Sequence, residues 1–287
     1  MRVAFVGLGV MGYPMAGYLA KCGHETVVYN RTASKAERWV QEYAGASALT
    51  PAAAAGEAQL VCVCVGNDDD LREVMYGPEG ILDAMPAGGV IVDHTTASAS
   101  VARELGGAAA ERSLGFVDAP VSGGQAGAEN GQRTIMLGGS DADVSKVEPV
   151  LQSYAKAITH IGAVGSGQLC KMVNQICIAG VLQGLAEGLH FAHKAGLDEA
   201  LVIEAISAGA AQSWQMENRW RTMVDGEFDF GFAVDWMRKD LGIALAEARQ
   251  NGAKLDLTEL VDRYYEEVQG LGGKRWDTSA LIARLPK

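Results

Sequence analysis

A lysine and two amides interrupt the apolar segment GSGQLCKMVNQICIAG at residues 165–180. Asn174 and Gln175 follow Lys171 by three and four residues, so a helix would place all three polar groups on one face. Partial burial lowers the pKa of a lysine toward neutral pH, where the amine can exchange a proton with a reacting oxygen. An amide one turn away can orient the ammonium or hold a substrate. The alternative is a surface lysine whose stem lies along the helix while its ammonium stays in water.

A glycine-rich turn lies near the start of the chain, in VAFVGLGVMG at residues 3–12. The apolar run at 3–9 predicts a parallel strand buried on both faces, and residues 11–22 predict a helix. In the pattern GxGxxG, the first glycine makes a tight turn and the second admits a pyrophosphate to the helix N-terminus. The third lets the helix pack on the strand. The turn therefore predicts a dinucleotide site formed by Gly7, Leu8, Gly9, Val10, Met11 and Gly12, with a structural glycine turn as the alternative.

The end of the second predicted strand, at 25–30, indicates which dinucleotide is bound. Sites for NAD place an acidic residue there on the ribose 2′-hydroxyl, whereas an arginine accommodates the 2′-phosphate of NADP. The corresponding residues here are Asn30, Arg31 and Thr32, and none of them is acidic. The Arg31 guanidinium can bind a phosphate bidentately, and Thr32 adds a hydroxyl. We therefore expect NADP(H) in preference to NAD(H), with Val65 also in the cofactor site. The alternative is that Arg31 is a solvated surface residue.

A serine followed by two glycines lies after another strand-like run, in DAPVSGG at residues 118–124. A sharp turn here exposes backbone N–H groups of Gly123 and Gly124, and the Ser122 hydroxyl adds a further donor. Such a turn suits a carboxylate group. The same residues are equally typical of a purely structural turn.

Strands and helices alternate through the first half of the chain, which predicts a doubly wound α/β sheet. The strand-like runs lie at 3–9, 25–30, 60–65, 89–95, 115–120, 134–139 and 157–162. After about residue 162, helical patterns dominate and no strand-like run ending in glycine remains. We therefore expect an α/β domain at 1–163 and an all-helical domain at 164–287.

Composition and charge argue against several classes of protein. The net charge of −11 and pI of about 4.9 argue against a binder of nucleic acid or membrane surfaces. Five cysteines without a CxxC pair indicate free thiols in a reducing cytoplasm. The N-terminus lacks the features of a signal peptide, and we expect no apolar stretch of about 20 residues to span a bilayer. His190 and His193 lack neighbouring acids in the sequence, so we expect no metal site.

These motifs together resemble those of the β-hydroxyacid dehydrogenase family. FVGLGVMGYPMA at 5–16 is similar to the family's N-terminal signature, and DAPVSGGQAGAENG at 118–131 to its substrate-binding segment. GSGQLCKMVNQ at 165–175 resembles the catalytic segment, and FAVDWMRKDLGIAL at 232–245 a later lysine-bearing one. The resemblance implies a Rossmann domain followed by an all-α domain, with a long interdomain helix starting near residue 166 and an active site in the cleft.

The resemblance also implies roles for individual residues. Lys171 would be the general acid/base, the turn at 122–124 would bind the substrate carboxylate, and Asn174 or Gln175 would position the substrate. Which amide acts stays open, because several members carry asparagine where this chain has Gln175. Trp214 would lie against the substrate.

Two further positions follow from the same resemblance. Thr96 would lie at the nicotinamide, and Lys239 would lie near the cofactor. The alternative for Lys239 and Asp240 is an exposed charge pair, which is the usual case for adjacent opposite charges. The acidic run at 67–70, NDDD, is interpreted as a solvated helix start, because acids stabilise helix N-termini.

The expected reaction is the NADP(H)-linked interconversion of a short 3-hydroxyacid, or ω-hydroxyacid, and its semialdehyde. Related imine reductases lack the lysine, so Lys171 favours a substrate with an oxygen at the reacting carbon. The alternatives are an imine reductase-like activity and a non-catalytic dinucleotide-binding regulator. Gly180, Gly184 and Gly188 fall four apart in the helical half, and with its alanines they predict close helix packing in a homodimer or homotetramer.

Overall fold

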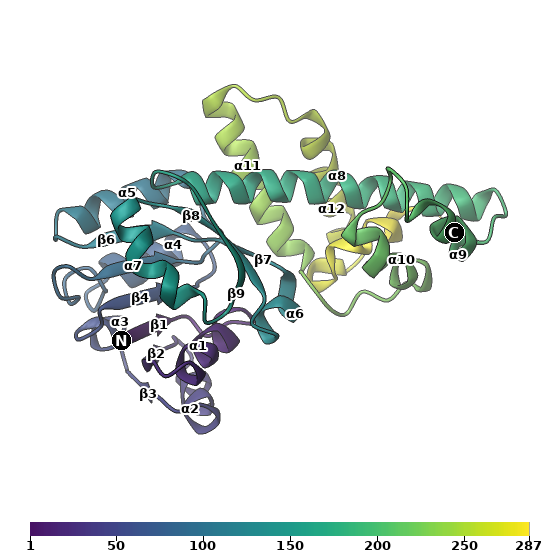
Figure 1. The fold of residues 1–287 in the computed structure, drawn as a ribbon. Helices are drawn as coiled ribbons and strands as arrows, with labels where there is room; N and C mark the ends of the chain where they lie inside the picture. Colours follow the sequence, from purple (N-terminus) through teal and green to yellow (C-terminus); the bar gives the residue numbers. More distant parts are fainter. Residues whose placement is uncertain (287) are drawn as a thin grey trace. The chain divides into compact units, whose positions relative to one another are not determined.

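The structure, a computed structural model, describes residues 1–286. The chain forms two compact units, Met1–Lys171 and Met172–Lys287 (Figure 1). Two clusters of buried apolar side chains lie in the first unit and a third lies in the second.

The first unit is built on one sheet with the strand order β3-β2-β1-β4-β5-β6-β8-β7, and β9 pairs with β8. Neighbouring strands from β3 to β6 are parallel, whereas β8 runs antiparallel to β6 and β7. The order 3-2-1-4-5-6 is that of the Rossmann dinucleotide-binding fold. The strands are β1 (Arg2–Val6), β2 (Glu25–Tyr29), β3 (Ala46–Ser47), β4 (Leu60–Val63), β5 (Val90–Asp93), β6 (Gly115–Asp118), β7 (Val121–Ser122), β8 (Arg133–Gly138) and β9 (Ala155–Gly162).

Helices cover both faces of this sheet, as Figure 1 shows. One face buries Met15, Trp39 and Val147, and the other buries Leu71 and Leu105. Because β1, β4 and β5 are covered on both sides, their residues are almost all buried and apolar rather than alternating with polar ones. The helices are α1 (Gly12–Lys21), α2 (Ala33–Glu42), α3 (Pro51–Ala55), α4 (Asp68–Tyr76), α5 (Ala99–Ala110), α6 (Gly124–Glu129) and α7 (Asp141–Leu151).

The second unit is helical, as the sequence predicts. The long helix α8 starts in the first unit and continues into the second. Its buried Leu182 packs in one apolar cluster with Met237 and Val261 of later helices. The helices are α8 (Ser166–Lys194), α9 (Glu199–Ile206), α10 (Trp214–Asp225), α11 (Val234–Asn251) and α12 (Asp256–Gly270), followed by 3-10 turns at Gly273–Arg275 and Thr278–Arg284.

Helix α8 is also relevant to whether any helix of the chain could span a membrane. Among the described residues it is the one helix long and apolar enough to cross a bilayer by length and composition. Of its most apolar window, 44% is buried inside the protein. A single helix of this kind is weak evidence for a membrane span, because a core helix of a soluble protein can have the same length and composition.

A strand forms at every predicted apolar run, and most of these strands are shorter than the run, whereas β9 begins two residues before its run, at Ala155. The run at 3–9 gives a strand that ends at Val6, because Gly7 has a φ of +100° and turns the chain away from the sheet. Strands β3 and β7 were not predicted, because two residues are too few to show an alternating pattern.

Candidate active site

The glycine turn joins β1 to α1 and is fixed by backbone contacts. The Gly7 N–H donates to the Tyr29 carbonyl at 2.8 Å, and the Leu8 N–H donates to Asn30 Oδ1 at 2.9 Å. A Cβ on Gly7 would overlap the Cys64 carbonyl, and one on Gly12 would overlap the Gly7 carbonyl. These two glycines are therefore required by the packing of the protein itself.

Gly9 differs from the other two glycines of the pattern. A Cβ built on it would meet nothing within 4 Å, and Gly9 and Val10 are both exposed. The open space beside Gly9 fits the close approach of a pyrophosphate, which the middle glycine of this turn serves. Leu8 is buried, whereas Met11 is half-buried at the start of α1.

Arg31 is highly exposed and is surrounded by acids. Its side chain is 77% exposed, and Nη1 lies 3.3 Å from Asp70 Oδ1 and 3.8 Å from Glu73 Oε2. Both acids belong to α4. Exposed ion pairs of this kind are weak, so a phosphate can displace them from the guanidinium. Thr32 is the N-cap residue of α2, and its side chain makes no capping hydrogen bond.

The segment that carries Thr96 is held on both sides. The Val65 N–H donates to Thr95 Oγ1 at 3.0 Å, which joins the ends of β4 and β5. Gln168 Nε2 donates to the Thr95 carbonyl at 2.7 Å, and Gln168 Oε1 accepts from the Ala97 N–H at 3.1 Å. Gln168 lies in the first turn of α8, so one side chain fixes the Thr96 segment to the helix that bears Lys171.

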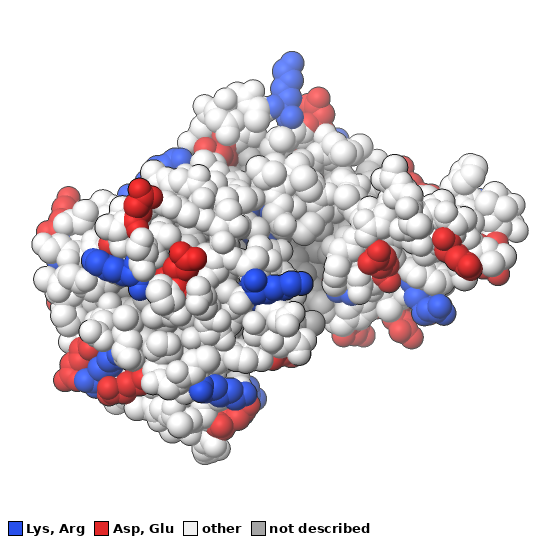
Figure 2. Space-filling view, in the orientation of Figure 1, with Lys and Arg blue, Asp and Glu red and all other residues white. Residues whose placement is uncertain are grey.

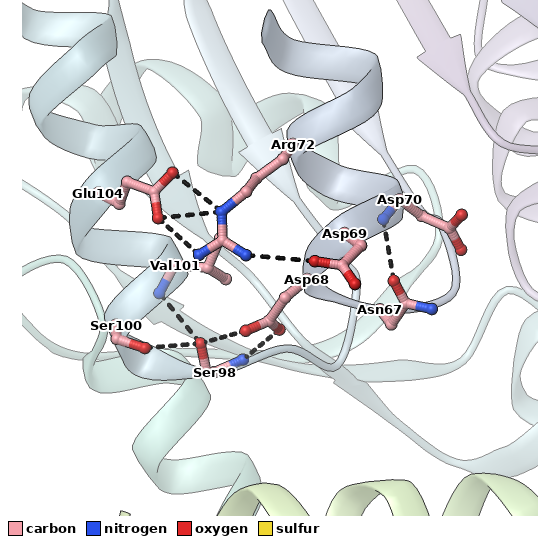
Figure 3. A network of polar contacts seen from close by, with 9 residues as sticks. All are labelled: Asn67, Asp68, Asp69, Asp70, Arg72, Ser98, Ser100, Val101 and Glu104. Atoms are coloured by element: carbon pink, nitrogen blue, oxygen red, sulfur yellow. Dashed lines mark hydrogen bonds and ion pairs between the residues drawn. The ribbon is translucent and has the colours of Figure 1, made fainter. Parts of the chain in front are cut away.

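The acidic run at 67–70 forms the start of α4, as predicted. Asn67 caps the helix by accepting from the Asp70 N–H at 2.9 Å. Asp68 accepts hydrogen bonds from the Ser98 N–H and hydroxyl, and Figure 3 shows that this contact ties α4 to the start of α5. Asp68 therefore reinforces the segment after β5 and is more than a solvated acid.

The first turn of α8 is anchored to the end of β6 by Asp118. Its carboxylate accepts from the Gly165 N–H at 2.6 Å and from the Gln168 N–H at 2.8 Å. A Cβ on Gly167 would overlap the Met136 carbonyl, so the helix lies directly against the strand ends. Lys171 follows one turn later and is buried, with 7% of its surface exposed. Its burial contradicts the alternative of a surface lysine.

Burial shifts the pKa values of three groups at these strand ends. It raises the pKa of Asp93 to about 7 and that of Asp118 to about 6, although backbone N–H bonds partly oppose both shifts. It lowers the pKa of His94 to about 4. His94 lies between the Ala119 carbonyl and the Tyr154 hydroxyl, and the imidazole is neutral at pH 7.

Asp93→Asn is expected to stabilise the protein more at high pH than at low pH. The folded-state pKa of Asp93 exceeds its unfolded value, so wild-type stability from this group falls as the pH rises from about 4 to 7. Asparagine does not ionise, so the stability of the variant does not fall in this way. The difference in free energy of unfolding, variant minus wild type, should therefore rise by about 2–3 kcal/mol between pH 5 and pH 8. Urea unfolding at both pH values measures the difference. A difference independent of pH would contradict the assignment.

The turn at 122–124 has the backbone that the sequence predicts. Ser122 ends β7, and Gly123 and Gly124 have φ values of +116° and +59°. These left-handed conformations favour glycine, and both glycines are exposed. Arg133, which sequence analysis did not single out, donates from Nη1 to the Gly124 carbonyl at 2.6 Å.

In the second unit, three predicted residues join one polar chain. Asn174 Nδ2 donates to Gln175 Oε1 at 2.7 Å, and Gln175 Nε2 donates to Asp240 Oδ2 at 2.7 Å. Lys239 Nζ lies 3.2 Å from Asp240 Oδ1. The interpretation of Lys239 and Asp240 as an exposed pair is wrong, because the Asp240 side chain is 1% exposed and that of Lys239 is 23% exposed.

Trp214 does not join this chain of contacts among the residues that the structure describes. It is the first residue of α10 and is 57% exposed, with Arg219 over its ring at 4.8 Å. Across residues 1–286, no group of three His, Cys, Asp or Glu side chains is arranged to hold a metal ion.

Two family models together match nearly the whole chain. The NAD binding domain of 6-phosphogluconate dehydrogenase matches residues 2–162, and the NAD-binding domain of NADP-dependent 3-hydroxyisobutyrate dehydrogenase matches residues 165–285. The chain belongs to the β-hydroxyacid dehydrogenase family. It is an oxidoreductase with NAD(P)-binding domains.

Other members of the β-hydroxyacid dehydrogenase family are similar over their full length. An uncharacterized oxidoreductase of Shewanella frigidimarina is 62% identical over 100% of this chain and 98% of its own. The 2-hydroxy-3-oxopropionate reductase of Escherichia coli is 33% identical over 99% and 97%. The structure of Mycobacterium tuberculosis 3-hydroxyisobutyrate dehydrogenase with L-serine is 27% identical, with a TM-score of 0.92 and complete coverage of both chains.

Proposed function

We propose that the protein interconverts a short 3-hydroxyacid, or ω-hydroxyacid, and its semialdehyde, with NADP(H) as the cofactor. The bound cofactor supplies or accepts the hydride at the substrate carbon. The main observation behind the proposal is that Lys171 is buried. It lies one turn after Gln168, whose side chain bonds to the residues on either side of Thr96. The similar Escherichia coli protein is named a 2-hydroxy-3-oxopropionate reductase, and the similar Mycobacterium tuberculosis structure was solved with L-serine. Both compounds carry a carboxylate and an oxygen on C3.

Lys171 is the proton-transferring group in this proposal. In the reducing direction its ammonium gives a proton to the carbonyl oxygen as the carbon receives the hydride, which leaves a hydroxyl and a neutral amine. In the oxidising direction the amine takes the hydroxyl proton as the hydride departs. Asn174 or Gln175 positions the substrate. Gln175 is bonded to the buried Asp240, whereas Asn174 is half-buried, so we favour Asn174 as the amide that contacts the substrate.

The remaining predicted residues complete the proposed site. The N–H groups of the 122–124 turn and the Ser122 hydroxyl hold the substrate carboxylate, so that the reacting carbon has one orientation. Thr96 and Lys239 lie at the cofactor, and Trp214 borders the substrate.

Arg31→Ala is expected to raise KM for NADPH about tenfold or more while KM for NADH changes little, because only NADPH carries the phosphate that Arg31 binds. Asp70→Asn should do the reverse and lower KM for NADPH, since the acid competes for Arg31 and repels phosphate. Asp69→Asn is the matched control, because Asp69 is 96% exposed and lies beside Arg72 instead. Steady-state kinetics with both cofactors measures the ratio. Equal effects of Arg31→Ala on both cofactors would contradict the preference for NADP(H).

We also propose that the protein works as a homodimer or homotetramer in the cytoplasm and binds neither nucleic acid nor membranes. Apolar and small residues on α8 are exposed, including Val181, Gly184, Gly188 and Phe191. Basic side chains on the face in Figure 2 are interspersed with acidic ones and form no continuous patch there. Light scattering of the purified chain tests the assembly, and a monomer at micromolar concentration would refute it.

The proposed reaction is tested by initial rates across a panel of short semialdehydes and 3-hydroxyacids, each with NADP(H) and NAD(H). We expect turnover of at least one acid-bearing substrate, faster with NADP(H). Turnover with NAD(H) alone would mean that Arg31 does not recognise the cofactor. Tight cofactor binding without turnover of any of these substrates would refute the proposed reaction and favour an imine substrate or a regulator.

A further inference from the structure

Arg133 is a buried cation at the start of β8. It is 1% exposed and is one of the largest fully buried side chains in the protein. No carboxylate among residues 1–286 forms an ion pair with it. A buried charge is normally paired, because its transfer from water is costly. Arg133 therefore carries a buried positive charge with no carboxylate partner among the described residues, and Cys64 is the group whose charge opposes the effect of burial on its pKa.

The guanidinium lies between the two turns of the proposed site. Nη1 donates to the Gly124 carbonyl, and Nη2 contacts the Met11 sulfur in the dinucleotide turn. Nε is buried without a hydrogen-bond partner among the described residues. A Cβ on Gly123 would lie 3.8 Å from Nη1, so the charge lies directly beside the 122–124 turn.

The charge persists at neutral pH. Burial lowers the pKa of Arg133 to about 10, which still leaves the group protonated at pH 7. In a poorly solvated position a charge acts on its neighbours more strongly than it would in water. Nη1 lies beside the 122–124 turn, so an anion bound at that turn would be attracted to this charge.

We propose that Arg133 is a positioning residue that makes the 122–124 turn selective for substrates bearing a carboxylate. Its hydrogen bond to the Gly124 carbonyl holds the left-handed turn whose N–H groups point to the anion. Its buried charge, beside the turn, attracts that anion without touching it. This inference rests on the proposed function and extends it by assigning the source of carboxylate selectivity.

The test compares a short 3-hydroxyacid with its methyl ester, which keeps the hydroxyl and the carbonyl oxygen but carries no charge and one additional methyl group. Binding of each to the cofactor-loaded protein is measured by calorimetry, and KM and kcat are measured for the corresponding semialdehydes. For Arg133→Met we expect the acid to bind about 10- to 100-fold more weakly, with the ester little changed. Arg133→Lys keeps the charge and should retain most of the acid-to-ester preference.

Several outcomes would overturn the inference. Equal losses for acid and ester in Arg133→Met would show a purely structural role for Arg133. A wild type that does not prefer the acid would show that there is no carboxylate selectivity for Arg133 to supply. If the methionine variant fails to fold, the lysine variant decides, because loss of the acid preference there contradicts a charge effect. A wild type that binds the acid selectively but does not turn over its semialdehyde refutes the proposed reaction alone. A wild type that binds neither ligand refutes both proposals.

Discussion

We expect Lys171→Met to lower kcat for semialdehyde reduction by about 10²- to 10⁴-fold, the usual contribution of a positioned general acid. Methionine preserves the length and apolar volume of the lysine stem, so the packing of the buried position should persist. The cofactor dissociation constant should change little, because the dinucleotide turn lies at the start of the chain and does not include Lys171. Stopped-flow reduction and NADPH fluorescence titration measure the two quantities separately.

The control for this variant is Lys194→Met, at the opposite end of α8. Lys194 is exposed and lies in the last turn of that helix. The control should keep both kcat and cofactor affinity at wild-type values. If Lys171→Met turns over at the rate of the control, Lys171 is not the proton donor.

Gly12→Ala should damage both the fold and cofactor binding, whereas Gly9→Ala should damage cofactor binding alone. A methyl group on Gly12 would overlap the Gly7 carbonyl and press on the Phe5 ring. Overpacking of this kind costs about 3 kcal/mol, which lowers Tm by roughly 6–12 °C in a chain of this size. On Gly9 the methyl group meets no protein atom within 4 Å, so Tm should stay at the wild-type value.

Cofactor affinity should fall in both variants, but in Gly9→Ala it should fall without any loss of stability. The methyl group of Gly9→Ala enters the space through which a pyrophosphate approaches the backbone, and we expect about a 10- to 100-fold rise in the NADPH dissociation constant. Thermal unfolding and calorimetric titration of both variants supply the measurements. An unchanged affinity in Gly9→Ala would place the pyrophosphate elsewhere.

The local patterns of the sequence predicted most of the fold. Apolar runs located the strands of the Rossmann sheet other than β3 and β7, and GxGxxG marked the dinucleotide turn, because both depend on residues close together in the chain. The change to helical patterns after residue 162 gave the helical second unit.

The groups that support the site could not be found in this way. Gln168 bonds to Thr95 and Ala97, more than seventy residues earlier in the chain. Asp118 similarly accepts from Gly165 across 47 residues. Nothing near either residue in the sequence indicates these contacts. They arise only when the sheet brings its strand ends together.

Sequence patterns also do not reveal which charged residues are buried. Asp240 beside Lys239 has the pattern of a surface pair, yet the aspartate is buried and bonded to Gln175. Arg133 lies in a polar stretch, QRT, before an apolar run, and its burial follows from packing against residues far away in the chain. Burial of a charge is set by tertiary contacts, which composition does not reveal.

The most direct test of the proposed reaction follows the hydride itself. The wild-type protein is incubated with NADPH that carries deuterium at both C4 positions and a mixture of short semialdehyde acids, and the products are analysed by mass spectrometry. We expect a hydroxyacid with one deuterium on the former carbonyl carbon, formed in equal amount to the NADP produced. Cofactor binding without any deuterated hydroxyacid would contradict it.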